Sequence, residues 1–450
     1  MGDPPGPTAG TERMVEYLRH ESRATAPGEV VADARTRVVD TIAAVTTGHG
    51  YAGVRALTDF AETTFAGGDL TILDGSGRTL NEPGVTLANS IAGNELDIDD
   101  GHRLAEGHPA VVIVPAALAA VEAIDGTVGD LLDAVIPAYE LAVRSARAMH
   151  EWLGILSGSG SWGAVGAAGA VAAAKGFDPA MTGHALGLAE FNAPISPVLR
   201  SVANPASSLT KDGIGWGGFV GSTAAALAAA GFTGSGTGFD AIEHEGLETP
   251  YLDSLGDRYH LLEGYYKPYP ACRWIHPAID GVAELFDRHA IDPDAVEAVT
   301  VQTHPNGAAL GITRPSTPSA AEYSYPYVIA AAVRNGGAFT HADLTAEART
   351  DPATLALAER VALTVDPDAA DRYPAESLAR IELSTPDGVY ETGLITPRGA
   401  NDRRLPEPEL EAKWRRLLDD TLGDGTTANL RDAVRDDDLP IRELLDPWRH

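Results

Sequence analysis

The chain has 450 residues, too many for one ordinary hydrophobic core, so we expect two or three domains. Its formal net charge of −31 and its pI of about 4.6 argue against nucleic acid or an anionic membrane as a partner. The lone cysteine, Cys272, excludes an internal disulfide and a four-cysteine metal site. The acid excess and the scarcity of lysine are typical of a halophilic, acidic proteome.

The first half of the chain has the apolar spacing of helices. Residues 12–66 repeat apolar side chains every three or four positions. Residues 1–11 lack the basic start and apolar run of a signal peptide, so we expect a cytoplasmic protein. Further helices are predicted at 110–124, 128–152, 163–175, 179–190 and 213–230.

Two uncharged stretches, 155–174 and 213–232, are long enough to span a bilayer. Both are rich in glycine, alanine and serine rather than leucine, which favours helices buried in a large helical core. Gly213, Gly217 and Gly221 recur every four residues and would let a neighbouring helix approach closely. We therefore expect no membrane insertion.

The pattern changes near residue 258. Tyr259–Tyr266, Val296–Thr303 and Ala379–Thr396 have the alternation of strands, and Pro386–Gly388 marks a hairpin turn. Helices are expected at 277–289 and 321–335, and again at Glu407–Leu422. The fold class is thus mostly α with an α+β second domain. We expect a large all-helical domain over 1–258, completed by about 400–450, and a smaller α+β domain over 259–399.

The segment between residues 97 and 108 concentrates ionisable side chains. It holds Asp97, Asp99, Asp100, His102 and His108. Carboxylates near histidines can orient a tautomer or exchange protons at neutral pH, and they can also bind a metal. Helix capping is the alternative interpretation. The apolar helix that begins at Ala110 favours a functional role, because His108 would lie at its N-terminus.

Three glycines match a dinucleotide-binding fingerprint at Gly158, Gly160 and Gly163. That fingerprint needs a preceding strand, whereas the preceding segment reads as a helix, so we reject it. Small residues at a helix start can still take a carboxylate through backbone N–H groups. Ser157, Ser159 and Ser161 are therefore candidate substrate-binding residues, with tight glycine packing as the alternative.

Only four of the 33 cationic residues are lysines, and two of them, Lys211 and Lys267, lie in unusual surroundings. A retained lysine indicates a site that needs a compact ammonium group. Lys267 is followed within nine residues by Cys272, Arg273 and His276. Arg273 suits bidentate carboxylate binding. Cys272 is a possible nucleophile, although a space-filling role is the more ordinary one.

A fourth cluster runs from Glu322 to Tyr327 and heads an apolar helix. The Tyr327 phenol could donate to an oxyanion or act as an acid, with core packing as the alternative. The sequence has no Gly-x-Ser-x-Gly elbow, no His-Glu-x-x-His and no Walker loop.

Taken in chain order, these clusters resemble the MmgE/PrpD family, which includes 2-methylcitrate dehydratase, cis-aconitate decarboxylase and iminodisuccinate epimerase. The resemblance covers nearly the whole chain. Its most specific pieces are Asp97-x-Asp-Asp with His108-Pro, the glycine-rich 157–169, Lys211, Lys267-Pro-Tyr-Pro-Ala-Cys-Arg and Ser324-Tyr-Pro-Tyr.

The resemblance implies a large helical domain with a smaller α+β lid domain. It also implies a homodimer, no metal or organic cofactor, and a polycarboxylate site between the two domains. It assigns Asp97, His108, Lys211, Lys267 and Tyr327 to that site. The decarboxylase branch has histidines where Ser157 and Cys272 fall, and a threonine at Gly101. These departures disfavour the decarboxylase, whereas the runs Asp-Asp-Gly-His-Arg, Gly-His-Pro and Ser-Gly-Ser-Trp-Gly look closer to the epimerase-like branch and its uncharacterised relatives.

From the resemblance we expect a cofactor-independent hydro-lyase that dehydrates a small tricarboxylate such as 2-methylcitrate, as in propionate catabolism. An epimerase or isomerase of a dicarboxylate such as iminodisuccinate, and a non-catalytic carboxylate-binding helical protein, stay open as alternatives. The substrate, its stereochemistry and any contact of Cys272 or His276 with it also stay open.

Such chemistry needs cations that hold carboxylates, and a base and an acid that move protons. We expect Lys211, Lys267 and Arg273 to anchor carboxylates. His108 is the first candidate for base or acid, oriented by Asp97. His102 and Tyr327 are candidates for the second proton transfer.

Overall fold

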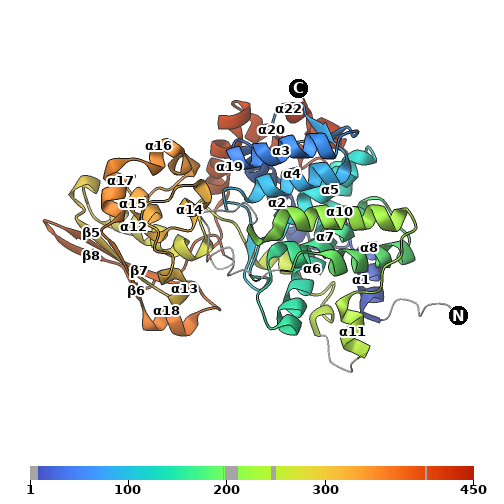
Figure 1. Cartoon of the computed structure of the whole chain (residues 1–450), viewed down its shortest axis with the longest axis horizontal. Coiled ribbons are helices and arrows are strands. Elements are labelled where there is room, and N and C mark those ends of the chain that lie inside the picture. Colours follow the sequence, from blue (N-terminus) through green and yellow to red (C-terminus); the bar gives the residue numbers. More distant parts are fainter. Residues whose placement is uncertain (1–8, 196, 198–210, 245–249, 401–402, 450) are drawn as a thin grey trace.

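The computed structural model describes residues 9–195, 197, 211–244, 250–400 and 403–449. It has two lobes, a large helical one that contains the first and last described helices and a smaller one that contains a sheet (Figure 1). The predicted fold class, mostly α with an α+β second domain, is confirmed.

The helical lobe is built mainly from the first half of the chain. Its helices are α1 (Ala9–His20), α2 (Gly28–Gly48), α3 (Ala52–Thr64), α4 (Glu82–Asn94), α5 (Ala110–Ala123), α6 (Val128–Leu153), α7 (Ser159–Ala174), α8 (Pro179–Asn192), α10 (Ile214–Ala229) and α11 (Gly238–His244). A two-residue hairpin, β1 (Leu70–Thr71) with β2 (Thr79–Leu80), lies between α3 and α4. Every residue of α5 from Ala110 to Glu122 is buried, which explains its continuous apolar sequence.

Helices α7 and α10 pack together at the centre of this lobe, against α4, α5, α6 and α8. A Cβ atom on Gly217 would lie 2.5 Å from the Cα atom of Gly160, and one on Gly221 would lie 2.5 Å from the Cβ atom of Ala167. The glycine repeat therefore permits close helix packing, as its spacing predicted. Among the described residues, no helix combines the length and the apolar character that a membrane crossing requires.

The smaller lobe contains a four-stranded sheet with the order β6-β5-β7-β8. Its strands are β5 (Ala298–Thr303), β6 (Val361–Val365), β7 (Ala379–Thr385) and β8 (Gly388–Glu391). β5 pairs with β6 in parallel and with β7 antiparallel, and alternate residues of β5 and β7 are buried. The predicted hairpin is confirmed, because Thr385 pairs with Gly388 at the turn between β7 and β8.

Helices cover and connect this sheet. They are α12 (His276–Arg288), α13 (Pro305–Ala308), α14 (Pro318–Glu322), α15 (Tyr325–Arg334), α16 (Ala346–Arg349), α17 (Pro352–Ala358) and α18 (Pro367–Arg372). The single helix predicted at 321–335 is wrong in its boundary. Ser324 interrupts it and caps α15, since its Oγ accepts from the Tyr327 backbone N–H at 3.0 Å.

The strand predicted at Tyr259–Tyr266 is also wrong. His260–Glu263 form a 3-10 turn, and only Gly264–Tyr265 (β4) pair as a strand, with Gly101–His102 (β3). The buried Glu140 carboxylate accepts from the N–H groups of His260 and Leu261, at 3.0 and 2.8 Å. These bonds hold a turn where the side-chain pattern favoured a strand.

After the sheet the chain returns to the helical lobe. This last segment contains α19 (Glu407–Leu422), α20 (Thr426–Ala433), α21 (Ile441–Leu444) and α22 (Asp446–Arg449). α19 packs against α2, and α21 against α5 and α6. Figure 1 shows these helices beside the N-terminal ones. The smaller lobe is thus inserted between two parts of the helical one, and the chain crosses the junction twice.

Candidate functional site at the junction of the two lobes

The loop between α4 and α5 carries the ionisable cluster. Asp97 adopts a left-handed backbone conformation, with φ of 47°. Asn94 fixes the next carboxylate by donating from Nδ2 to Asp99 Oδ1 at 2.9 Å. Asp100 accepts from the N–H of Ala110 at 3.0 Å and from Arg37 Nη1 at 2.7 Å. Asp100 therefore caps α5 and neutralises a buried arginine.

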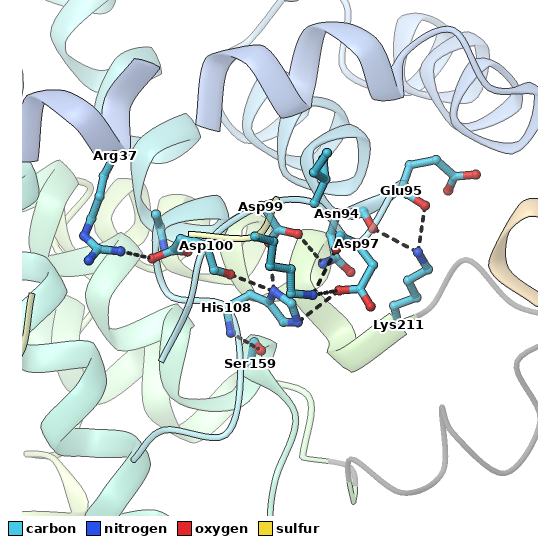
Figure 2. A network of polar contacts seen from close by, with 12 residues as sticks. Arg37, Asn94, Glu95, Asp97, Asp99, Asp100, His108, Ser159 and Lys211 are labelled. Carbon is cyan, nitrogen blue, oxygen red and sulfur yellow. Dashed lines mark hydrogen bonds and ion pairs between the residues drawn. The ribbon is translucent and has the colours of Figure 1, made fainter. Parts of the chain in front are cut away.

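His108 lies at the centre of this loop and is held on three sides (Figure 2). Its Nδ1 donates to the Asp100 carbonyl at 2.9 Å and lies 3.0 Å from Asp99 Oδ2. Its backbone N–H donates to Ser159 Oγ at 3.0 Å. Nε2 lies 3.5 Å from Asp97 Oδ1. The ring orientation is thus set through Nδ1, and Nε2 is the atom available for chemistry.

This arrangement changes the protonation of His108. Burial favours the neutral ring, but the Asp99 carboxylate outweighs it and raises the pKa of His108 to about 9. Burial also opposes ionisation of Asp99, yet the imidazolium holds the pKa of that carboxyl below its ordinary value. His108 is therefore a cation at neutral pH, which suits a general acid rather than a general base.

Lys267 reaches the same loop from the other side of the junction. Its ammonium donates to the Asp97 carboxylate and, at 3.0 Å, to the Asp97 carbonyl. Lys267 is 1% exposed. Burial alone would lower the pKa of the Lys267 amine, but the neighbouring acidic groups, Asp97 first among them, together outweigh burial. The pKa of Lys267 therefore lies above its ordinary value, and the amine is charged. Two of its three N–H donors are engaged by one residue, and one remains for a ligand.

These groups border a small cavity of about 70 Å³ between the lobes. Its lining residues are Asp97, His102, Arg103, Glu106, Gly107, His108, Asp212, Tyr265, Lys267, Cys272, Arg273, Trp274 and Tyr323. Cations and carboxyl groups both line it. Such a surface suits a small polar ligand with several ionised groups.

Comparison with known families agrees with this two-lobe architecture. Residues 12–247 match the model of the MmgE/PrpD N-terminal domain, and residues 269–439 match that of the MmgE/PrpD C-terminal domain. The chain belongs to the MmgE/PrpD family. Membership supports an enzyme of the dehydratase or lyase type and leaves the substrate open. No curated protein matches the chain significantly.

Several residues predicted for this MmgE/PrpD site do line the cavity, namely Asp97, His102, His108, Lys267, Cys272 and Arg273. The orienting partner of His108 differs from the prediction. Asp99 and the Asp100 carbonyl hold Nδ1, whereas Asp97 lies on the Nε2 side and pairs with Lys267. Burial raises the pKa of the Cys272 thiol to about 12, which opposes a nucleophilic role.

Lys211 does not line the cavity. Its ammonium donates to the carbonyls of Asn94 and Glu95, at 3.0 and 2.7 Å, and to the Glu322 carboxylate. These three acceptors use all its N–H donors. Glu322 ends α14 of the smaller lobe, so this buried ion pair ties the two lobes together. The geometry favours a structural role over the anchor role that we expected.

Tyr327, His102 and His276 are engaged in structural bonds. The Tyr327 phenol donates to the Asp343 carbonyl at 2.5 Å, and Tyr327 is absent from the cavity lining. His102 Nε2 donates to the His260 carbonyl at 3.0 Å, and its Nδ1 accepts from two backbone N–H groups. Burial lowers the pKa of His102 to about 3. His276 is fully buried with Nε2 bound to the Ala271 carbonyl at 3.0 Å.

The three serines at the start of α7 are also buried. Ser161 Oγ donates to Ser157 Oγ, 2.8 Å away, and lies 2.7 Å from the Gly158 carbonyl. Ser159 Oγ accepts from His108. None of the three lines the cavity. Ser159 therefore holds the backbone of His108 in place. The segment before the glycines is the helix α6, as predicted.

Six further residues that line the cavity were not predicted from the sequence, namely Arg103, Glu106, Asp212, Tyr265, Trp274 and Tyr323. Tyr265 explains one departure from the decarboxylase pattern. A Cβ atom on Gly101 would lie 2.3 Å from Cζ of the Tyr265 ring. A threonine at Gly101 would therefore displace Tyr265. The Tyr265 ring also lies under Arg273, whose Cζ atom is 4.3 Å from the ring centroid.

Asp97, Asp99 and His108 could hold a metal ion, since their ligand atoms lie within 4.8 Å of one another. The Lys267 ammonium already lies on the Asp97 carboxylate, and Asp99 binds His108 Nδ1. A divalent ion would have to displace Lys267 from its partner. The charge of this cluster is balanced by the chain's own cations, and the residues fit an ammonium better than a metal.

Proposed function

We propose that this MmgE/PrpD protein is a cofactor-independent dehydratase of a small tricarboxylate such as 2-methylcitrate. The observation that carries the proposal is the position of His108, whose Nδ1 lies 3.0 Å from Asp99 Oδ2 and which lines a cavity together with Lys267 and carboxyl groups. A fixed acid beside a carboxylate-binding cation is what an elimination next to a carboxylate needs.

In this proposal Lys267 binds a substrate carboxylate through its third N–H and stabilises the charge that develops there. Asp212 accepts the proton from the carbon next to that carboxylate. Burial raises the pKa of Asp212, which makes its ionised form a stronger base. The electrons of the C–H bond form the C=C bond, the C–O bond breaks, and His108 Nε2 protonates the leaving hydroxyl to give water.

An epimerase of a dicarboxylate such as iminodisuccinate is the second candidate. It is favoured by Gly101, which accommodates Tyr265 where the decarboxylase branch has threonine. Inversion of a centre needs a base on one face and an acid on the other, and Asp212 and His108 line the same cavity. The two candidates share the proton abstraction and differ in whether a hydroxyl leaves.

The test is turnover of EDTA-treated protein in deuterated water and high salt, followed by proton NMR. The substrates are 2-methylcitrate, citrate, cis-aconitate and iminodisuccinate, each supplied alone. A vinylic product signal from either citrate supports the dehydratase. Deuterium incorporation without elimination supports the epimerase. Ligand-induced stabilisation without proton exchange would instead support the non-catalytic carboxylate-binding protein.

We further propose a homodimer in a cytoplasm of high salt. Exposed apolar side chains on the helical lobe, including Phe60, Trp216 and Leu227, offer a surface for a second copy. The net charge of −31 repels itself unless salt screens it. Light scattering in 2 M and in 0.1 M potassium chloride, with melting curves at both, tests these statements. A monomer with salt-independent melting would refute both.

A further inference from the structure

The cations that the sequence nominated as carboxylate anchors are largely engaged with the protein itself. Lys211 has no N–H left, and Lys267 has one. Arg273 donates from Nη1 to the Arg398 carbonyl at 2.7 Å and from Nη2 to the Pro397 carbonyl at 3.4 Å. Lys267 and Arg273 each keep an N–H donor, so this set offers two cations to a ligand that carries three carboxylates.

Arg103 supplies what is missing. It lies in the turn after β3 of the helical lobe and lines the cavity. Its Nε donates to the Ala375 carbonyl of the smaller lobe at 3.1 Å. Its Nη2 is buried and has no hydrogen-bond partner among the described residues. Leaving a buried guanidinium N–H unbonded costs free energy, so this atom needs an acceptor.

The charges around the cavity also indicate that Arg103 binds a carboxylate. Asp97, Glu106 and Asp212 all line it, and their carboxyl groups repel an anionic ligand. Lys267 is neutralised by Asp97, whereas Arg103 has no ion pair among the described residues. With Lys267 and Arg273 facing two carboxylates, a third substrate carboxylate finds its counter-ion at Arg103.

We propose that Arg103 binds a terminal carboxylate of the substrate through Nη2 and so selects tricarboxylates over dicarboxylates. The inference rests on the proposed function and names a specificity-determining residue for it. Because Arg103 also holds Ala375, carboxylate binding and closure of the smaller lobe are coupled. The cavity volume of about 70 Å³ is small beside the roughly 300–1,000 Å³ of ordinary ligand pockets, so the lobe must open for entry.

The test compares binding of tricarballylate, an unreactive tricarboxylate, with binding of succinate, by calorimetry in carboxylate-free buffer. In R103Q we expect tricarballylate to bind at least tenfold more weakly and succinate to change less than threefold. R103K, which keeps the charge but not the planar fork, recovers part of the loss. With the turned-over tricarboxylate, KM rises tenfold or more in R103Q, while kcat stays within threefold.

Arg404→Gln is the matched control. Arg404 also donates to a backbone carbonyl, that of Leu262 at 2.8 Å, but lies outside the cavity lining. R404Q should bind both probes as the unaltered protein does. Tricarballylate binding within threefold of normal in R103Q, or an equal loss for both probes, overturns the inference while the proposed function stands. An unaltered protein that neither binds nor converts a carboxylate overturns both.

Discussion

Replacing Asp99 with asparagine should convert His108 from a cation into a neutral ring at working pH. The Asp99 carboxylate lies 3.0 Å from Nδ1, and its charge offsets the burial that would otherwise favour the neutral form. The difference between the ordinary pKa of 6.5 and about 9 corresponds to ~3 kcal/mol in favour of the protonated ring, at 1.36 kcal/mol per pH unit. Without the carboxylate, the His108 pKa should fall to 6.5 or below.

The expected consequence is a shift in the alkaline limb of activity. If protonated His108 is the acid, kcat/KM of the unaltered protein declines with an apparent pKa of about 9. At pH 8 the protonated fraction falls from roughly 0.9 to roughly 0.03 in D99N, so activity should fall about 30-fold. The associated stability follows the same sign: a raised histidine pKa stabilises the fold below pH 6.5, and this contribution is lost as the pH rises through about 9.

The assay is the pH dependence of kcat/KM together with NMR titration of His108. Glu263→Gln is the control, because it breaks a similar contact, His260 Nδ1 to Glu263 Oε2 at 2.9 Å, outside the cavity lining. E263Q should leave the alkaline limb in place. A His108 that titrates near 6.5 in the unaltered protein, or a D99N profile identical to normal, would refute the reasoning.

Four other substitutions separate site from scaffold. K267A should lower kcat at least 100-fold with a retained circular dichroism spectrum; near-normal turnover would contradict its anchor role. K211M should lower the free energy of unfolding in urea by about 3–5 kcal/mol, because it leaves Glu322 buried without its cation; an unchanged midpoint would disprove this. Y327F should keep turnover within twofold and lose about 1 kcal/mol of stability, since its phenol bonds to a backbone carbonyl; a 100-fold loss of kcat would restore it to the site. C272S should stay active, and the native thiol should resist alkylation at pH 8, because burial raises the pKa of Cys272 to about 12; rapid alkylation would refute that environment.

Local patterns were sufficient for most of the secondary structure. The alternation in β5 and β7 matches their alternating burial, and the small-residue spacing of α10 matches its close packing on α7. One failure was local, since Ser324 caps α15 inside the segment predicted as a single helix, and the other occurred where a distant group intervened. The Glu140 carboxylate imposed a turn on a segment with strand-like alternation. Sequence spacing carries no information about such a partner.

The candidate site divides in the same way. The density of ionisable residues in short segments, and the rarity of lysine, pointed to Asp97, His108 and Lys267. All three line the cavity. The sequence also selected Lys211 and Tyr327, whose polar atoms bond to protein groups outside the cavity lining. The type of a residue and its neighbours in the sequence do not determine whether its polar atoms point into the cavity or bond to other parts of the protein.

The sequence by itself determined the helical and α+β halves, the acidic surface and the cluster around His108. The tertiary structure alone decided that Asp99 rather than Asp97 lies against Nδ1 of His108 and keeps the ring protonated, and that Arg103 and Tyr265 border the cavity. The physical reason is that hydrogen-bond partners and burial set the charge of a group. Within the loop that carries His108, the folded backbone decides which carboxylate meets Nδ1, whereas Tyr265 reaches the cavity from a segment far away in the chain.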